Sequence, residues 1–288
     1  MSDSYLAEIN RERPGCILVL LDQSASMGDP FAGDRTIRKA NAAADAINKL
    51  LMDLVIQCTQ NFDEGPRNYF DVGVIGYGSR AGVGPCFGGV LSGRELVSIQ
   101  DLATNQLRVE ERAKTVADGA GGVVTVSVRF PVWFDPVAEA GTPMAEAMQR
   151  AKRVLEPWVS RHENSYPPIV INITDGEPNS DPTRAARELV GLQTTDGHVL
   201  LYNLHLSALA LAPITFPASS AKLPDKYAQM LFGMSSEVPP RIQQELSKEG
   251  YFAEPGTRGF VFNADAGAMI QFLDIGTRLS LEGMTGER

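Results

Sequence analysis

The apolar run at residues 16–21 (CILVLL) ends abruptly in a carboxylate and two hydroxyls, those of Asp22, Ser24 and Ser26. A short continuous apolar run is typical of a strand buried on both faces, as in the middle of a parallel sheet. The three polar side chains would then lie at the carboxyl end of this strand. Hard oxygen atoms are the ligands that Mg²⁺, Mn²⁺ and Ca²⁺ prefer. The segment therefore predicts a buried strand that brings cation ligands to one edge of a sheet.

Apolar strand-like runs alternate with helical periodicities along the rest of the chain, which is typical of an α/β fold with a mostly parallel sheet. A helix is expected at residues 36–57, where apolar side chains recur with helical spacing. Residues 94–136, which include the strand-like VVTVSV, are the least regular part, and this region is interpreted as an elaboration on the sheet edge. Further strands are expected at 70–77, 168–174, 199–206 and 259–262.

No linker interrupts these segments, so the chain is interpreted as a single domain at residues 14–282. Residues 1–13 form an N-terminal extension and residues 283–288 a C-terminal tail. The elaboration of the domain is placed at about residues 79–136. This organisation leaves every candidate ligand within one folding unit.

The composition is that of an ordinary globular protein, with 43% hydrophobic and 21% charged residues among 288. A net charge of −9 without a dense Lys/Arg cluster argues against nucleic-acid binding. The N-terminus lacks the apolar segment of a signal peptide, and no run approaches the length of a membrane span. Cys16, Cys58 and Cys86 share no metal-ligand spacing, so reduced thiols and a cytoplasmic location are expected.

Two further positions are expected to join the first cluster. Asp175 follows the apolar run IVINIT, and Thr142 precedes a segment with helical periodicity. Loops that follow parallel strands gather at the carboxyl edge of the sheet, where open α/β folds bind ligands. Each residue also has an ordinary explanation, since Ser and Thr cap helices and Asp-Gly is a common turn. Their joint occurrence, in this order and after these strands, favours a metal site.

The set Asp22-x-Ser24-x-Ser26, Thr142 and Thr174-Asp175-Gly176, with its apolar flanks, resembles the von Willebrand factor A (vWA) domain family over residues 14–282. The resemblance implies a single Rossmann-like vWA domain, with a mostly parallel central sheet, one antiparallel edge strand and helices on both faces. It also implies a metal-ion-dependent adhesion site (MIDAS). Its ligands would be Asp22, Ser24, Ser26, Thr142 and Asp175, holding Mg²⁺ (or Mn²⁺ or Ca²⁺).

The charge count indicates what such a site would bind. Only two carboxylates would face a divalent cation, and Mg²⁺ commonly keeps exchangeable waters, so a carboxylate from outside can complete its shell. We therefore expect a metal-dependent protein–protein interaction module that binds a partner's Glu or Asp, and not an enzyme. Loops at 27–35, 176–183 and 212–224 would set specificity. The candidate partner contacts are Met27, Gly28, Asp29, Gly176, Glu177 and Phe216.

The rival function is a Mg²⁺-dependent hydrolase or phosphotransferase that uses the same cation. Aspartate-nucleophile phosphatases need a second carboxylate two residues after the nucleophile, and Ser24 stands there instead. No nucleophile elbow or Cys/His pair offers an alternative. A third reading is a scaffold with a vestigial site. The chain is most similar to intracellular bacterial vWA proteins of stress or conflict modules, which implies a kinase, phosphatase or ATPase as partner.

Overall fold

Five parallel strands form the centre of the computed structural model, which describes residues 4–59, 61, 63–117, 122–206 and 212–281. Their order across the sheet is β14, β12, β9, β1, β4. Numbered by their order along the chain, the five parallel strands lie across the sheet as 5-4-3-1-2. The strands are β1 (Gly15–Asp22), β4 (Phe70–Ser79), β9 (Ile169–Thr174), β12 (Leu200–Leu206) and β14 (Phe260–Ala264).

Short antiparallel strands border this parallel centre. On one side β5 (Gly82–Pro85) and β6 (Val97–Ser98) both pair with β4. On the other side β13 (Ile214–Thr215) pairs with β14. The expected fold class, a mostly parallel α/β sheet covered by helices, is confirmed.

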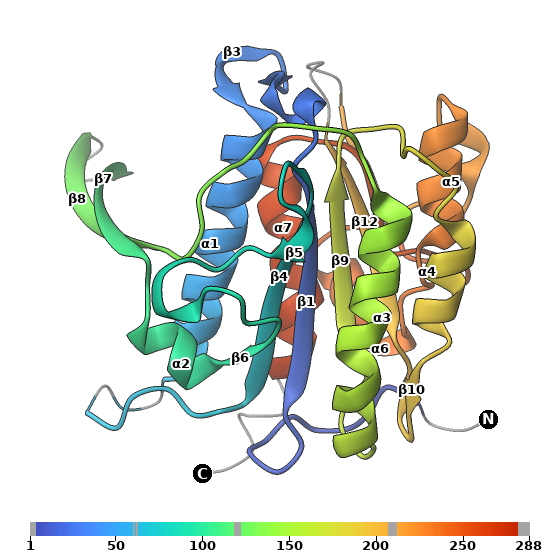
Figure 1. The fold of residues 1–288 in the computed structure, drawn as a ribbon, viewed down its shortest axis with the longest axis horizontal. Helices are drawn as coiled ribbons and strands as arrows, with labels where there is room; N and C mark the ends of the chain where they lie inside the picture. The colour runs from blue at the N-terminus through green and yellow to red at the C-terminus, as the bar shows by residue number, and fades with distance from the viewer. Residues whose placement is uncertain (1–3, 60, 62, 118–121, 207–211, 282–288) are drawn as a thin grey trace.

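Helices cover both faces of the sheet, as Figure 1 shows. One face carries α1 (Lys39–Gln57), α2 (Ile99–Thr104), α6 (Pro240–Lys248) and α7 (Ala266–Leu281). The other carries α3 (Met144–Arg161), α4 (Thr183–Val190) and α5 (Lys226–Met234). This two-sided cover explains why the strands are apolar throughout rather than alternating.

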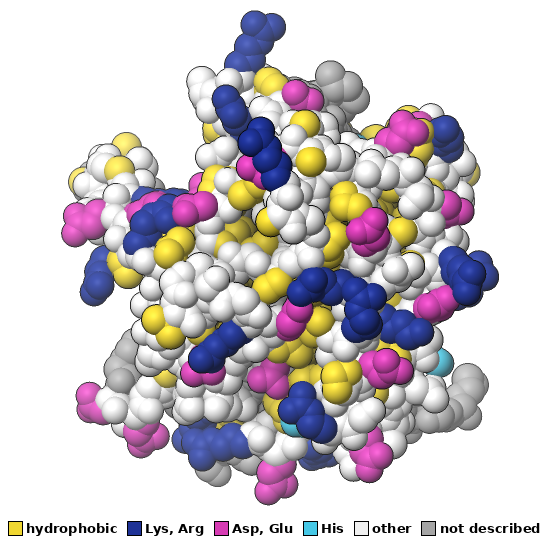
Figure 2. Space-filling view, in the orientation of Figure 1, with side chains coloured by type: hydrophobic (Ala, Val, Ile, Leu, Met, Phe, Trp, Pro, Cys, Tyr) yellow, Lys and Arg dark blue, Asp and Glu magenta, His cyan; other side chains and the backbone are white. Residues whose placement is uncertain are grey.

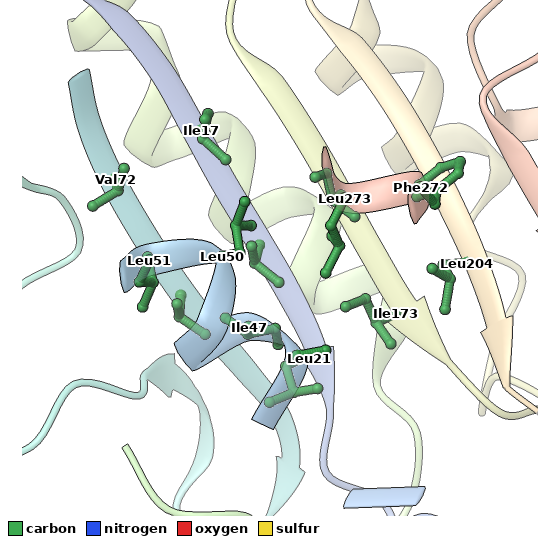
Figure 3. Packing of buried hydrophobic residues seen from close by; sticks show 14 of the residues in the cluster. Ile17, Leu21, Ile47, Leu50, Leu51, Val72, Ile173, Leu204, Phe272 and Leu273 are labelled. Carbon is green, nitrogen blue, oxygen red and sulfur yellow. The ribbon is translucent and has the colours of Figure 1, made fainter. Parts of the chain in front are cut away.

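Alternate residues of β1 belong to two separate cores. Ile17 and Leu21 pack with Ile47 and Leu50 of α1 (Figure 3). Cys16, Leu18 and Leu20 point the other way and pack with the helices of the opposite face. Burying each such side chain stabilises the fold by roughly 1.5–3 kcal/mol, so β1 contributes to both layers at once.

The predicted helix at 36–57 begins three residues later than expected. Residues before Lys39 form a hairpin of β2 (Pro30–Phe31) and β3 (Asp34–Arg38). The turn between these strands uses Gly33 at φ +83°, a conformation that favours glycine. The remaining short elements are η1 (Ala25–Gly28), η2 (Gly89–Leu91), β10 (Gln193–Thr194), β11 (Gly197–His198) and η3 (Ser220–Lys222).

The interpretation of residues 94–136 as a sheet-edge elaboration is correct for β6, which pairs with β4, but wrong for the strand-like VVTVSV segment, which does not join the main sheet. It lies in β8 (Val123–Val132), whose one partner strand in the described residues is β7 (Arg108–Ala117). Figure 1 shows this two-stranded arm projecting away from the body beside α1. An ion pair of 2.9 Å joins Arg112 of the arm to Asp45 of α1.

The surface agrees with the expectation of no extended basic face. On the side shown in Figure 2, dark blue and magenta side chains are interspersed rather than gathered by sign. None of the helices that the structure describes is both long and apolar enough to cross a membrane. Cys16 and Cys58 are buried free thiols, as expected for core positions.

The arm is expected to be dispensable for folding of the body. Replacing residues 111–129 by an Asn-Gly turn should change the free energy of unfolding by about 1 kcal/mol or less, because exposed ion pairs such as Arg112–Asp45 contribute little. Trp133, at the base, is the matched contrast. It is 1% exposed and its indole donates to Leu102 O at 2.8 Å, so Trp133→Ala should cost about 3–5 kcal/mol. Chemical denaturation of both variants checks this, and an unfolded arm deletion would contradict it.

Candidate metal centre

The carboxyl ends of β1 and β9 meet at the point where the strand order reverses. From β1 the chain proceeds to β4 on one side, whereas β9 and the later strands lie on the other. In open α/β sheets such a switch point leaves a crevice that binds ligands. Asp22 is the last residue of β1, and Asp175 directly follows β9. The sheet topology therefore brings the two candidate carboxylates to one place.

Asp22 is held rigidly inside the protein. Its residue is 1% exposed, and one carboxylate oxygen accepts from the backbone N–H of Ser24 at 2.8 Å. The other oxygen accepts from the hydroxyl of Thr174 at 2.6 Å. Burial raises the pKa of Asp22 to about 6, although these hydrogen bonds oppose the shift. A buried carboxylate without a charged partner is the kind of group that a bound cation would stabilise.

A chain of hydrogen bonds links the serines to the second carboxylate. The hydroxyls of Ser24 and Ser26 lie 3.1 Å apart. Ser26 in turn donates to Asp175 Oδ1 at 2.8 Å. Side-chain oxygen atoms of Ser24, Ser26 and Asp175 are thus connected at hydrogen-bond distance, and Asp22 joins them through the backbone N–H of Ser24.

Thr142, the fifth, is brought beside this chain by its backbone. Ala25 donates to the carbonyl of Ala140 at 2.8 Å, and Ser24 forms a parallel bridge with the same residue. Asn179 fixes Thr142 from the other side: its side-chain oxygen accepts from Thr142 N, and its own N–H donates to Thr142 O, both at 2.9 Å. The segments after β1, before α3 and after β9 therefore form one hydrogen-bonded cluster.

Gly78 permits this close approach. It lies at the end of β4 with φ +98°, and its carbonyl accepts from Ala140 N at 2.8 Å. A Cβ at this position would lie 2.4 Å from Gly141 O and 2.8 Å from Ser24 N. Only glycine fits there without moving the backbone of the site.

The donor set fits a hard divalent cation. Two carboxylates and several hydroxyls are oxygen donors of the type that Mg²⁺ and Mn²⁺ accept. Across the described ranges, no three His, Cys, Asp or Glu side chains gather in one place. A cation here would therefore rely on the serine and threonine hydroxyls as well as the carboxylates. The residues that would hold it are Asp22, Ser24, Ser26, Thr142 and Asp175.

The structure adds residues that the sequence pattern did not single out. Thr174 donates to Asp22, and Asn179 braces Thr142, as described above. Lys39, the first residue of α1, is 5% exposed and its ammonium lies 2.7 Å from Asp175 Oδ2. A lysine in the same helical register as the buried residues Ala43 and Ile47 was the available signal.

Below the site, a chain of buried polar side chains crosses the sheet. The hydroxyl of Tyr77 donates to Asn172 at 2.8 Å, and Asn172 donates to Asn203 at 2.9 Å. Asn203 then donates to the hydroxyl of Ser235 at 3.0 Å. These residues are 0–1% exposed and every bond crosses between elements. A fully paired polar network of this kind ties the relative positions of β4, β9 and β12 together.

The candidate partner contacts divide into two groups. Gly28, Asp29, Gly176 and Glu177 are at least partly exposed. Met27 is 0% exposed in the core, because the turn after Ser26 directs its side chain inward. Phe216 is 5% exposed and stacks on Phe272 of α7. Met27 and Phe216 are thus core residues, not surface for a partner.

The histidines remain outside the ligand set. His205 stacks on Phe262 with ring centroids 4.6 Å apart, in agreement with a structural role on its strand. Burial lowers the pKa of His205 to about 4, so the ring is neutral at physiological pH. His162 stacks on Trp158, and His198 lies in the short strand β11.

Neither a protein-family model nor a curated protein matches this chain. Among solved structures, the chain is similar to the crystal structure of manganese-loaded Plasmodium vivax TRAP protein. The identity is 14%, the match covers 93% of this chain and 74% of that chain, and the TM-score is 0.45. A TM-score below 0.5 does not establish a shared fold or function. The description of the fold and of the site therefore rests on the geometry above.

Cation binding should weaken as the pH falls through about 6. Ionised Asp22 attracts the cation, and protonation of a group with a pKa of about 6 competes with it. Apparent Mn²⁺ affinity, measured by electron paramagnetic resonance of the free ion, should fall about tenfold per pH unit below 6 and level off above 7. A pH-independent affinity between 5 and 7 would contradict this role of Asp22.

The metal-free protein should show the opposite dependence. The pKa of Asp22 is raised from 3.8 in the unfolded chain to about 6, so its contribution to stability is complete below pH 3.8 and is lost as the pH rises through 6. The loss is roughly 3 kcal/mol. Denaturation in EDTA at pH 4, 5 and 7, compared with Asp22→Asn, measures it. The variant should lack this part of the pH dependence.

Proposed function

We propose that this protein is a metal-dependent interaction module, in which a divalent cation at the carboxyl edge of the sheet binds a carboxylate of a protein partner. The observation that carries the proposal is the convergence of Asp22, Ser24, Ser26 and Asp175 into one oxygen-lined cluster, with Thr142 tied beside it. This is the ligand set that the resemblance to the vWA family implies for a MIDAS.

The shortage of protein charge supports a binding role. The five predicted ligands include two carboxylates, and one of these is already paired with Lys39. A divalent cation in this cluster would keep positive charge that the protein does not balance. A Glu or Asp from a partner supplies the missing negative charge and an oxygen ligand of the preferred type.

The environment of Asp22 argues against the rival phosphotransferase. A nucleophilic carboxylate must be reached by the reacting atom of a substrate, which is far larger than a metal ion. Asp22 is 1% exposed, so a substrate has little access to its carboxylate. Ser24, two residues later, cannot act as the second carboxylate of an aspartate-nucleophile site. Binding rather than bond cleavage is the function that this geometry favours.

The cysteine pattern supports a cytoplasmic location for the proposed module. The resemblance to bacterial vWA proteins supports a role in a stress-response or conflict system, with a kinase, phosphatase or ATPase as partner. The exposed positions Gly28, Asp29, Gly176 and Glu177 surround the cluster in sequence and supply the contacts that would select this partner.

Removing a ligand should abolish cation binding without unfolding the protein. Asp22→Ala deletes a buried charge that faces the cation, so Mn²⁺ affinity should fall by about 30-fold or more in calorimetry. Asp34→Ala is the matched control. Asp34 is an exposed loop carboxylate that bonds to Thr36, so its loss should leave Mn²⁺ affinity unchanged. Equal Mn²⁺ affinity for Asp22→Ala and the wild type would refute the site.

Capture of the partner should depend on the same cation. Partner proteins retained from a lysate with Mg²⁺ present should be released by EDTA, and a partner peptide with Glu or Asp changed to the amide should not bind. Retention that survives both EDTA and Asp22→Ala would show that the interaction uses another surface.

A further inference from the structure

Lys39 is a buried cation inside the candidate metal site. Its side chain is 6% exposed, and that of Asp175, its partner, is 1% exposed. The ammonium lies 2.7 Å from Asp175 Oδ2 and 3.4 Å from the carbonyl of Ser26. The carboxylate of Asp29, which is 61% exposed, is 3.8 Å away. Lys39 thus contacts the backbone or side chain of two predicted ligands.

The two oxygens of Asp175 have separate partners. Oδ1 accepts from Ser26, on the side of the hydroxyl cluster, and Oδ2 is taken by Lys39. Asp22 differs, because both of its hydrogen-bond donors are neutral groups. Within the cluster, Asp22, Asp175 and Lys39 together carry a net charge of about −1 rather than the −2 of the carboxylates alone.

Stability alone does not explain this lysine. A positive side chain in the first turn of a helix is unfavourable to the helix dipole. Burying an ammonium also costs desolvation energy that a single ion pair only partly offsets. An apolar residue would continue the buried face of α1, where Ala40, Ala43 and Ile47 follow. The Lys39–Asp175 ion pair is therefore better explained by a role in the site than by a contribution to the stability of the core.

We infer that Lys39 is a positioning residue that sets the charge balance of this site. By holding Asp175 in an ion pair, it lowers the affinity of the protein's own ligands for the cation. The bound cation would then keep more uncompensated positive charge for an incoming carboxylate. This inference rests on the proposed cation site and deepens it. It assigns the preference for an external carboxylate to one ion pair. The pair Lys39–Asp175 makes the site a weaker metal chelator and a better anion receptor.

Replacing the lysine should therefore tighten metal binding, whereas loss of a merely structural residue would weaken it. In Lys39→Met, the freed Asp175 oxygen and the loss of a nearby like charge should increase Mn²⁺ affinity roughly tenfold or more. Lys39→Arg keeps the charge and should stay near the wild-type affinity. Lys49→Met is the matched control, since Lys49 lies on the same helix and pairs with Asp53. It should leave Mn²⁺ affinity unchanged.

Acetate provides the second readout. In the Mn²⁺-loaded protein, acetate should displace water from the ion, which lowers the water-proton relaxation rate. Its affinity should be about threefold or more lower in Lys39→Met than in the wild type, because the site has lost one positive charge. Mn²⁺ affinity that is unchanged or reduced in Lys39→Met would overturn the inference, and so would unchanged acetate affinity.

Two further measurements keep the outcomes separate. Removing one partner of a buried ion pair destabilises a protein, so thermal melting in EDTA establishes that each variant is folded. If Lys39→Met does not fold, Lys39→Gln, which keeps a donor for Asp175, takes its place with the same expected direction. Mn²⁺ binding by the wild type supports the proposed site whatever the variants do. Failure of both wild type and variant to bind Mn²⁺ would remove site and inference together.

Discussion

The structure depends on the position of β1 between β4 and β9. All eight residues of β1 are buried, and the strand is in register with a parallel neighbour on each side. Both of its faces are apolar, so alternation of polarity does not set its register. The ends do. Gly15 lies so close to the ring of Phe70 that a Cβ would come within 2.6 Å, and Asp22 pairs with Tyr77 where the hydrogen-bonded site begins. A slip by one residue would break both ends.

Much of this could be predicted from local sequence. The order of strands and helices follows from apolar runs and helical spacing, and the ligand motif lies directly at strand ends. What failed depended on tertiary contacts. The run VVTVSV has the composition of a strand but pairs with β7 in a separate arm, and composition does not name a strand's partner. Met27 and Phe216 lie within predicted site loops, yet their apolar side chains are buried in the core.

The residues that lie together at this edge of the sheet could be predicted from the sequence, whereas the residues that brace them could not. Asp22 and Asp175 could be identified because both directly follow buried apolar strands whose carboxyl ends meet at one edge of the sheet. Thr174 and Asn179 could not, since their bonds to Asp22 and Thr142 join segments that are distant in sequence. Local rules are broken mainly where function requires it. Lys39, a charge on the buried face of α1, is such a violation, and its ammonium contacts Asp175 of the site.

The proposed recruitment of an external anion poses a conflict that the Lys39–Asp175 pair would resolve. Strong binding of a cation calls for many carboxylates, but each carboxylate reduces the attraction for a partner's Glu or Asp. Neutral hydroxyls from Ser24 and Ser26 supply ligand oxygens without charge, and Lys39 compensates one of the two charges that remain. The fold provides the rigidity this requires, because the network below the site fixes the strands that carry it. Under the proposed function a cation would therefore be held by geometry more than by charge, and its unbalanced charge would remain for a partner's carboxylate.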